Sequence, residues 1–235
     1  MTIALLCPTR GRSEQCKRMI KSAADTSTGG NVSVHLGIQG EYPEYEYPRH
    51  DFGISRTQLP DWPTSMKWNH LAENIIKAPF DATTRLFMLA ADDIIFATPL
   101  WDKALLDHYR SLENKIHVYA LQDSRDPDGT PHPIVTREYI DAMGYFLPPI
   151  FLHWYVDSWT VEIAKANSCF THFKDYLLIH DKPSDRGEGD ETHKSIRRAG
   201  WRERDKWVAE KCITWLAHEK SRLATIIALS ESSAA

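Results

Sequence analysis

Cysteine is scarce in this sequence, and the cysteines that it has are far apart. The 235 residues include four of them, Cys7, Cys16, Cys169 and Cys212, and no Cys-x-x-Cys pair. This spacing indicates neither a zinc knuckle nor a disulfide framework. Because free thiols are typical of a reducing compartment, we expect a cytoplasmic protein.

Long apolar runs and a strong net charge are also absent. No run approaches the roughly 20 residues that a membrane-spanning helix needs. The segment from Met1 to Pro8 has no charged leader, and its apolar run is too short for a signal peptide. The net charge is only −4, so any nucleic-acid-binding surface must be local rather than global. We therefore expect no membrane association.

Short apolar segments alternate with amphipathic segments along the chain. The apolar segments predict strands over 3–7, 32–39, 86–91, 116–121 and 170–180. The amphipathic segments predict helices over 13–24, 65–78, 99–112, 137–143 and 158–166, and a long C-terminal helix that contains Trp207 and frays over 230–235. Residues 40–63 are rich in Tyr, Pro and Asp and predict an irregular loop. This alternation indicates an α/β fold with a mostly parallel central sheet flanked by helices.

Two adjacent acids, Asp92 and Asp93, follow the apolar run 86–91. Open α/β sheets bind ligands at the carboxyl ends of their strands. Carboxylate oxygens at that position suit a hard cation such as Mg²⁺ or Mn²⁺, which in turn would hold a diphosphate. The alternative is that the pair caps the next element and contacts only water.

The turn after the first predicted strand carries two arginines, Arg10 and Arg12, on either side of Gly11. Their guanidinium groups can form paired hydrogen bonds with phosphate oxygens, and Gly11 allows the backbone to come close to a ligand. The alternative is a pair of solvated surface arginines.

Four segments, in this order, form a further pattern. They are Pro8-Thr9-Arg10-Gly11-Arg12, Asp92-Asp93, Met143-Gly144-Tyr145-Phe146 with Trp154-Tyr155-Val156-Asp157-Ser158-Trp159, and Ile179-His180-Asp181-Lys182-Pro183. Together they resemble the GT-A fold, family-2-like glycosyltransferases, especially the phage-type members. The likeness spans 3–195 and implies a GT-A-like domain there, with 196–235 as a helical extension packed on the same domain.

Two positions depart from the family's pattern. The chain has Ala91-Asp92-Asp93 where the family has Asp-x-Asp, so one carboxylate is displaced or missing. Val156 stands where the family's acceptor motif has Glu, which leaves Asp157 as the only acid of that motif.

The resemblance implies transfer of a sugar from a nucleoside-diphosphate sugar, such as a UDP-sugar, to a hydroxyl acceptor. Asp93 and His180 would hold Mn²⁺ or Mg²⁺, and Asp157 would act as the general base of an inverting reaction. The donor would contact Pro8, Thr9, Arg10, Arg12, Gln39, Lys67, Asn69, Asp92 and Lys182. Aromatic neighbours would partly desolvate Asp157 and raise its pKa.

Local alternatives remain for two of these residues. His180 could be a strand-end histidine bonded to a neighbouring carbonyl. Asp157 could instead cap a helix that begins at Ser158.

A local excess of basic residues lies between 194 and 211. The basic residues are Lys194, Arg197, Arg198, Arg202, Arg204, Lys206 and Lys211, against Glu203, Asp205 and Glu210, with Trp201 and Trp207 between them. Basic side chains and aromatics on one surface can follow a phosphate backbone and stack on bases. The alternative is a solvated amphipathic helix of mixed charge.

The resemblance also bears on the acceptor, because phage-type members include enzymes that glycosylate hydroxymethylated pyrimidines in DNA. It therefore implies double-stranded DNA as an acceptor and the host cytoplasm as the location. The acceptor would contact Trp154, Trp159, Arg197, Arg198, Trp201 and Arg202. Three alternatives stay open: a glycan acceptor, a sugar nucleotidyltransferase, and a non-catalytic module that binds nucleotide sugars.

Overall fold

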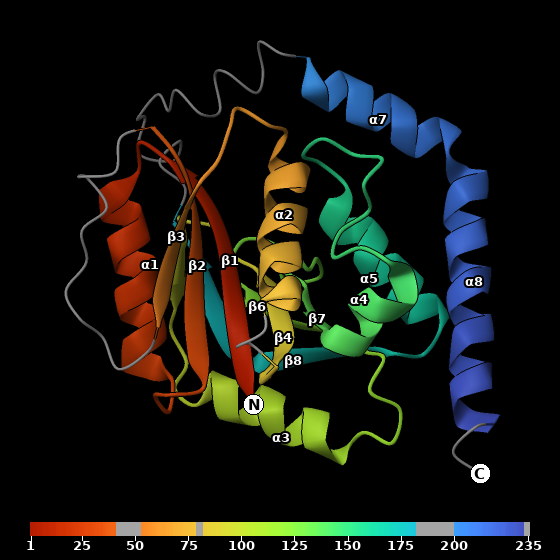
Figure 1. The fold of residues 1–235 in the computed structure, drawn as a ribbon, viewed down its shortest axis with the longest axis horizontal. Helices are drawn as coiled ribbons and strands as arrows, with labels where there is room; N and C mark the ends of the chain where they lie inside the picture. Colours follow the sequence, from red (N-terminus) through yellow and green to blue (C-terminus); the bar gives the residue numbers. More distant parts are fainter. Residues whose placement is uncertain (41–52, 79–81, 182–199, 233–235) are drawn as a thin grey trace.

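The computed structural model describes residues 1–40, 53–78, 82–181 and 200–232 (Figure 1). Its strands are β1 (Thr2–Arg10), β2 (Val32–Gln39), β3 (Ile54–Gln58), β4 (Thr84–Leu89), β5 (Ile94–Phe96), β6 (Val118–Asp123), β7 (Ile134–Thr136) and β8 (Phe170–His180). Its helices are α1 (Ser13–Thr26), α2 (Thr64–Lys77), α3 (Trp101–Ser111), α4 (Arg137–Met143), α5 (Val156–Ala166), α7 (Trp201–Lys211) and α8 (Ile213–Ser232).

The strands form one curled sheet in the order β3-β2-β1-β4-β7-β6-β8-β5. The pairs β1–β2, β1–β4, β2–β3 and β6–β8 are parallel, whereas β4–β7, β6–β7 and β5–β8 are antiparallel. The prediction of a mostly parallel central sheet is therefore confirmed. The chain leaves β1 for β2 on one side and reaches β4 on the other, which creates the switch point where ligands bind in such sheets.

Both faces of the sheet are covered, because successive side chains of a strand point to opposite faces. Leu5 of β1 belongs to the core shared with α1 and α3, and Leu6 belongs to the core shared with α2, α4 and α5. Both leucines are completely buried. A strand buried on both faces reads as a continuous apolar run, which is why β1 and β4 were recognisable from the sequence.

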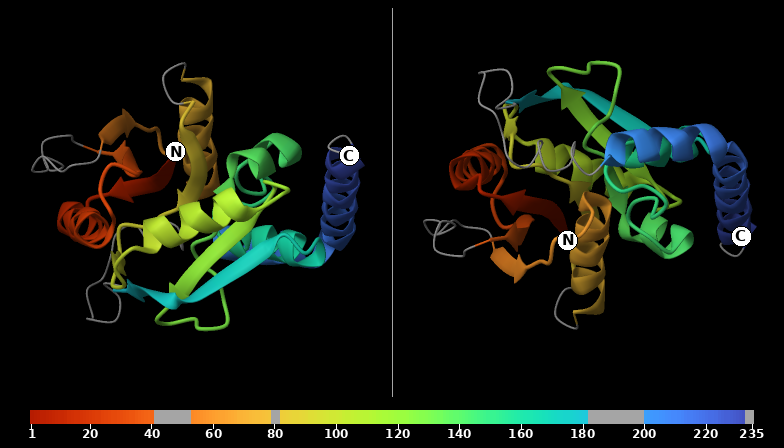
Figure 2. Two further views of the ribbon diagram at one scale, coloured as in Figure 1. Left: turned by 90° about the horizontal axis from the view of Figure 1, so that it is seen from below. Right: turned by 90° about the horizontal axis from the view of Figure 1, so that it is seen from above.

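Helix α8 lies at the edge of the molecule, far from α1 (Figures 1 and 2). Its Leu216 and Leu223 are buried in the core that α4 and α5 also form. Between them, Glu219 is buried and accepts hydrogen bonds from Tyr145 and Arg222 at 2.7 Å each. No helix in the described part of the chain is long and apolar enough to cross a membrane.

Two predictions of secondary structure were wrong. Residues 40–63 were expected to be irregular throughout, but 54–58 form β3, which pairs with β2 at the edge of the sheet. Its side chains are mostly exposed, so the strand lacks the apolar pattern that would reveal it. The single C-terminal helix is two helices, because the chain bends at Cys212, and α8 continues to Ser232 instead of fraying from 230.

Candidate functional site

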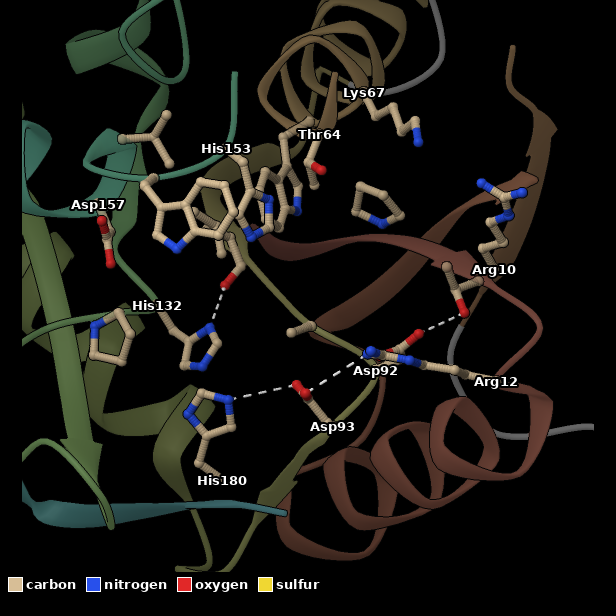
Figure 3. A pocket seen from close by; sticks show the side chains of 18 of the residues that line it. Arg10, Arg12, Thr64, Lys67, Asp92, Asp93, His132, His153, Asp157 and His180 are labelled. Carbon is tan, nitrogen blue, oxygen red and sulfur yellow. Dashed lines mark hydrogen bonds and ion pairs between the residues drawn. The ribbon is translucent and has the colours of Figure 1, made fainter. Parts of the chain in front are cut away.

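A cavity of about 270 Å³ lies beyond the carboxyl ends of β1, β2 and β4 (Figure 3). Its lining comes from Pro8, Thr9, Arg10, Arg12, Gln39, Thr64, Lys67, Trp68, Leu89, Ala91, Asp92, Asp93, Pro131, His132, His153, Trp154, Tyr155, Val156, Asp157 and His180. Strand ends and the loops after them therefore supply most of the polar groups, as expected at a switch point.

One end of the cavity is cationic. Arg10 at the end of β1 and Lys67 on α2 point into this end (Figure 3). The ammonium group of Lys67 donates to Oε1 of Gln39 at 2.5 Å. Burial lowers the pKa of Lys67 to about 8. Next to Lys67, the indole Nε1 of Trp68 donates to the carbonyl oxygens of Leu6 and Ala90, which fixes α2 on the sheet.

Arg12 and Asp92 form a buried ion pair on the floor of the cavity. The guanidinium donates to Oδ1 of Asp92 at 2.8 Å, and Thr9 donates to Oδ2 at 2.7 Å. Burial raises the pKa of the Asp92 carboxyl, although the Arg12 charge opposes that effect. Both oxygens of Asp92 are thus engaged, so its main role in this structure is to hold Arg12 and Thr9. Oδ2 of Asp93 lies 3.7 Å from the same guanidinium nitrogen of Arg12.

Asp93 joins three residues that the chain brings together from other strands. Its Oδ1 lies 3.6 Å from Nε2 of His180, and Nδ1 of His180 lies 3.2 Å from Oδ2 of Asp123. Nε2 of His132 lies 3.9 Å from the same Asp123 oxygen. Single ligand atoms of Asp123, His132 and His180 all lie within 4.8 Å of one another. We call these four residues the Asp/His cluster.

The protonation of His132 and Asp123 fits a divalent cation. His132 donates from Nδ1 to the carbonyl of Leu89, and its buried Nε2 has no hydrogen-bond partner among the residues that the structure describes. Burial lowers the pKa of His132 to about 4, so the ring is neutral and Nε2 offers a lone pair. Burial alone would raise the pKa of Asp123, but hydrogen bonds from His180 and the Arg125 amide lower it to about 2. Neutral imidazoles and ionised carboxylates are what a bound divalent cation requires.

Asp157 lies at the other end of the cavity from Arg10 (Figure 3). It is the second residue of α5, which begins at Val156, so it is not the helix cap that one interpretation expected. Oδ1 accepts a hydrogen bond from its neighbour Ser158 at 2.8 Å. Burial raises the pKa of Asp157, as the sequence predicted from its aromatic neighbours.

Several residues expected at the site lie elsewhere. The amide of Asn69 binds the backbone of Phe146 and Leu147, so it fixes a turn and does not line the cavity. Trp159 is buried in the core, where it stacks on Trp215. Trp201 and Arg202 belong to α7, outside the lining. Lys182, Arg197 and Arg198 lie outside the described residues.

Two residues of the Asp/His cluster, Asp123 and His132, were not identified from the sequence. Asp123 ends β6 and could have been found by the strand-end argument that identified Asp92 and Asp93. His132 precedes β7 in a turn-rich stretch, and nothing local distinguishes it.

Comparisons with known proteins place the fold. No family model matches the sequence, and no curated protein matches it either. Among solved structures, S. aureus TarS matches 77% of this chain with a TM-score of 0.53 at 10% identity. TarS 1–349 in complex with UDP matches 76% with a TM-score of 0.55, also at 10% identity. The fold is GT-A-like.

The GT-A-like match covers only part of the TarS chains. This chain spans 37% of TarS and 60% of the 1–349 fragment with UDP. A second structure of that fragment gives a TM-score of 0.51, with 62% of its length covered. At this level of identity the likeness concerns the backbone arrangement alone.

Proposed function

We propose that this chain is a metal-dependent glycosyltransferase that moves a sugar from a nucleoside-diphosphate sugar, a UDP-sugar, to a hydroxyl group. The observation that carries the proposal is the pairing of two groups in one cavity of a GT-A-like fold. The Asp/His cluster has a buried imidazole nitrogen without a hydrogen-bond partner among the described residues, and the carboxylate of Asp157, whose pKa burial raises, lines the same cavity. The UDP-bound TarS structure supports the choice of donor.

The Asp/His cluster would hold Mn²⁺ or Mg²⁺ through Asp93, Asp123, His132 and His180. Such an ion supplies a Lewis acid that neutralises the leaving diphosphate. Arg10 and Lys67 then add positive charge at the end of the cavity away from Asp157. Arg12 acts indirectly, because its ion pair with Asp92 fixes the turn that carries Arg10.

Asp157 would take the proton of the acceptor hydroxyl. As the acceptor oxygen bonds to the anomeric carbon, the bond from that carbon to the diphosphate oxygen breaks on the opposite side. A single base facing the donor therefore gives inversion. The raised pKa of Asp157 makes it a stronger base than an ordinary carboxylate, which favours proton transfer near neutral pH.

For the acceptor we propose a hydroxymethylated pyrimidine in double-stranded DNA. The support is on α7, where Arg202, Lys206 and Trp207 are exposed and could contact a phosphate backbone and a base. The described part of α7 carries four basic residues (Arg202, Arg204, Lys206, Lys211) and three acidic ones (Glu203, Asp205, Glu210), so its own net charge is only +1. A glycan remains the competing acceptor.

The decisive experiment measures product mass and UDP release with DNA containing hydroxymethylcytosine, Mn²⁺ and a panel of UDP-sugars. We expect a sugar-sized mass gain on the modified base, and Asp157→Asn should lower kcat by about 10²- to 10⁴-fold without weakening UDP binding. A matched control is Asp175→Asn, an exposed carboxylate on β8.

The other outcomes separate the alternatives. Slow UDP release without any DNA product would keep the glycosyltransferase and replace DNA by a glycan. Release of pyrophosphate when UTP and a sugar 1-phosphate replace the UDP-sugar would identify a nucleotidyltransferase instead. No Mn²⁺-dependent UDP binding at all would overturn the proposed function.

A further inference from the structure

The backbone of the loop before α5 is held by one buried carboxylate of α7. Asp205 is completely buried, although it is a charged residue on a helix whose other charged residues are exposed. Its Oδ2 accepts hydrogen bonds from the amides of His153 at 2.8 Å and Trp154 at 3.0 Å. The amide of Leu152 donates to both oxygens, at 2.9 and 3.1 Å.

Arg204 and Ser65 complete the hold on this loop. One guanidinium nitrogen of Arg204 donates both to the carbonyl of Ile150 at 2.7 Å and to Oδ1 of Asp205 at 2.8 Å. From the opposite side, Ser65 of α2 donates its hydroxyl to the carbonyl of Phe151 at 2.6 Å and its amide to that of Leu152 at 3.0 Å. Side chains of two helices, α2 and α7, therefore fix the backbone of this loop by hydrogen bonds.

This loop forms one wall of the cavity. His153, Trp154 and Tyr155 line the cavity, and the chain continues directly into α5 with Asp157. Tyr155 has φ of 68°, a left-handed conformation that a side chain with a Cβ rarely adopts. Such a residue persists only where its surroundings fix it, and the hydrogen bonds to Asp205 end at the residue just before it.

Burial of a charge is unfavourable unless hydrogen bonds replace the lost water. The donors that replace it for Asp205 are three consecutive amides and one guanidinium group, all aimed at two oxygens. An apolar residue in this place would leave the three amides of the loop without this acceptor. Asp205 therefore determines the backbone path of the cavity wall and does not only stabilise α7.

We propose that Asp205 and Arg204 are positioning residues of the active site: α7 sets the wall that presents Trp154 and Asp157 to the acceptor. This inference rests on the proposed function for the identity of the acceptor side. It assigns to the C-terminal part of the chain a role in turnover that is independent of any contact between α7 and DNA.

Asp205→Asn tests the proposal, because the shape is kept and one acceptor oxygen becomes a donor. In either orientation its NH₂ group faces Arg204 or the loop amides. We expect kcat to fall by about tenfold to 100-fold with the KM for the UDP-sugar unchanged, because Asp205 and Arg204 hydrogen-bond to the loop before α5 and not to the Asp/His cluster or to Lys67. Glu203→Gln makes the same chemical change on the exposed face of α7 and should leave both values at the wild-type level.

A second measurement does not require turnover. The acrylamide quenching of Trp154, obtained as the difference between each protein and its Trp154→Phe form, should increase in Asp205→Asn. If Asp205→Asn does not fold, Arg204→Met replaces it, because Arg204 is 44% exposed and should be tolerated. Its effects should have the same direction and be smaller.

The outcomes distinguish a failure of this inference from a failure of the proposed function. A lower melting temperature with wild-type kcat and wild-type Trp154 quenching would make Asp205 an ordinary structural residue and overturn the inference. If the wild-type protein shows no turnover, the proposed function fails, and the quenching result alone then decides whether α7 positions the wall.

Discussion

The two ends of the cavity floor differ in how far their polar groups are already paired. Beside the first strand, the guanidinium of Arg12 donates to Asp92 and the ammonium group of Lys67 donates to Gln39, so each cation already has a side-chain acceptor. In the Asp/His cluster, by contrast, the lone pair of His132 Nε2 has no hydrogen-bond donor among the described residues. The first arrangement maintains the shape of the site, and the second is complete only when something binds. Stability and ligand affinity should therefore depend on different residues.

The largest effect should come from removing the charge of Asp92, which pairs with Arg12. Asp92→Asn removes the nearer of the two carboxylates that pair with Arg12, whose side chain is 10% exposed, and leaves Asp93 with Oδ2 3.7 Å from the guanidinium. Because a buried charge that loses its hydrogen-bonded ionic partner is strongly unfavourable, we expect the free energy of unfolding to fall by about 3 kcal/mol. Urea denaturation measures it. Asp25→Asn, which removes an exposed partner of Lys21, should change stability by less than about 1 kcal/mol. Equal losses in both variants would contradict the pairing argument.

The next largest effect should be that of His180→Ala on Mn²⁺ binding by the Asp/His cluster. Removal of one ligand should weaken Mn²⁺ binding by about 100-fold or more, with little change in unfolding free energy. Calorimetric titration with Mn²⁺ gives the affinity. His172→Ala, on the same strand, is the control, because Nε2 of His172 is also buried without a hydrogen-bond partner in the described part of the chain and lies outside the cluster. Unchanged Mn²⁺ affinity in His180→Ala would remove His180 from the metal site.

The smallest effect concerns Lys67, which is paired and yet titrates near neutral pH. Its pKa of about 8 means that it is charged below that pH and loses its charge as the pH rises through it. UDP affinity should therefore fall by about two- to fivefold between about pH 7 and pH 9. In Lys67→Arg, which stays charged, this decrease should disappear. A decrease of the same size in both proteins would assign it to another group.

The same comparison explains what the sequence could reveal. Strand β1, helix α1 and the turn through Arg12 are continuous in sequence, and the apolar run of β4 leads straight to Asp92 and Asp93. Local patterns were therefore enough to pick out residues that line that end of the cavity. Asp123, His132 and His180 meet only because β6, β7 and β8 converge in space, with an antiparallel strand between parallel ones. Of these three residues, only His180 was named in advance, and a family resemblance supplied it.

Some residue types misled the interpretation for a physical reason. Asn69 has the polarity of a donor-binding residue, but its amide matches two backbone amides and one carbonyl of a neighbouring turn. Asp205 was counted as one charge in a mixed surface helix, yet it is completely buried. A side chain's polarity predicts that it needs partners, whereas only the fold determines whether those partners are ligand, backbone or water.

The hydrogen bonds between α7 and the cavity wall also affect the order in which parts of the protein can fold during synthesis. A ribosome makes the chain from its N-terminus, and Asp205 follows its partner Leu152 by 53 residues. The strands that carry the Asp/His cluster are therefore finished while the wall still lacks its acceptor for three amides. The nascent chain can assemble the end with the Asp/His cluster first, but the wall before α5 must wait for α7 to leave the exit tunnel.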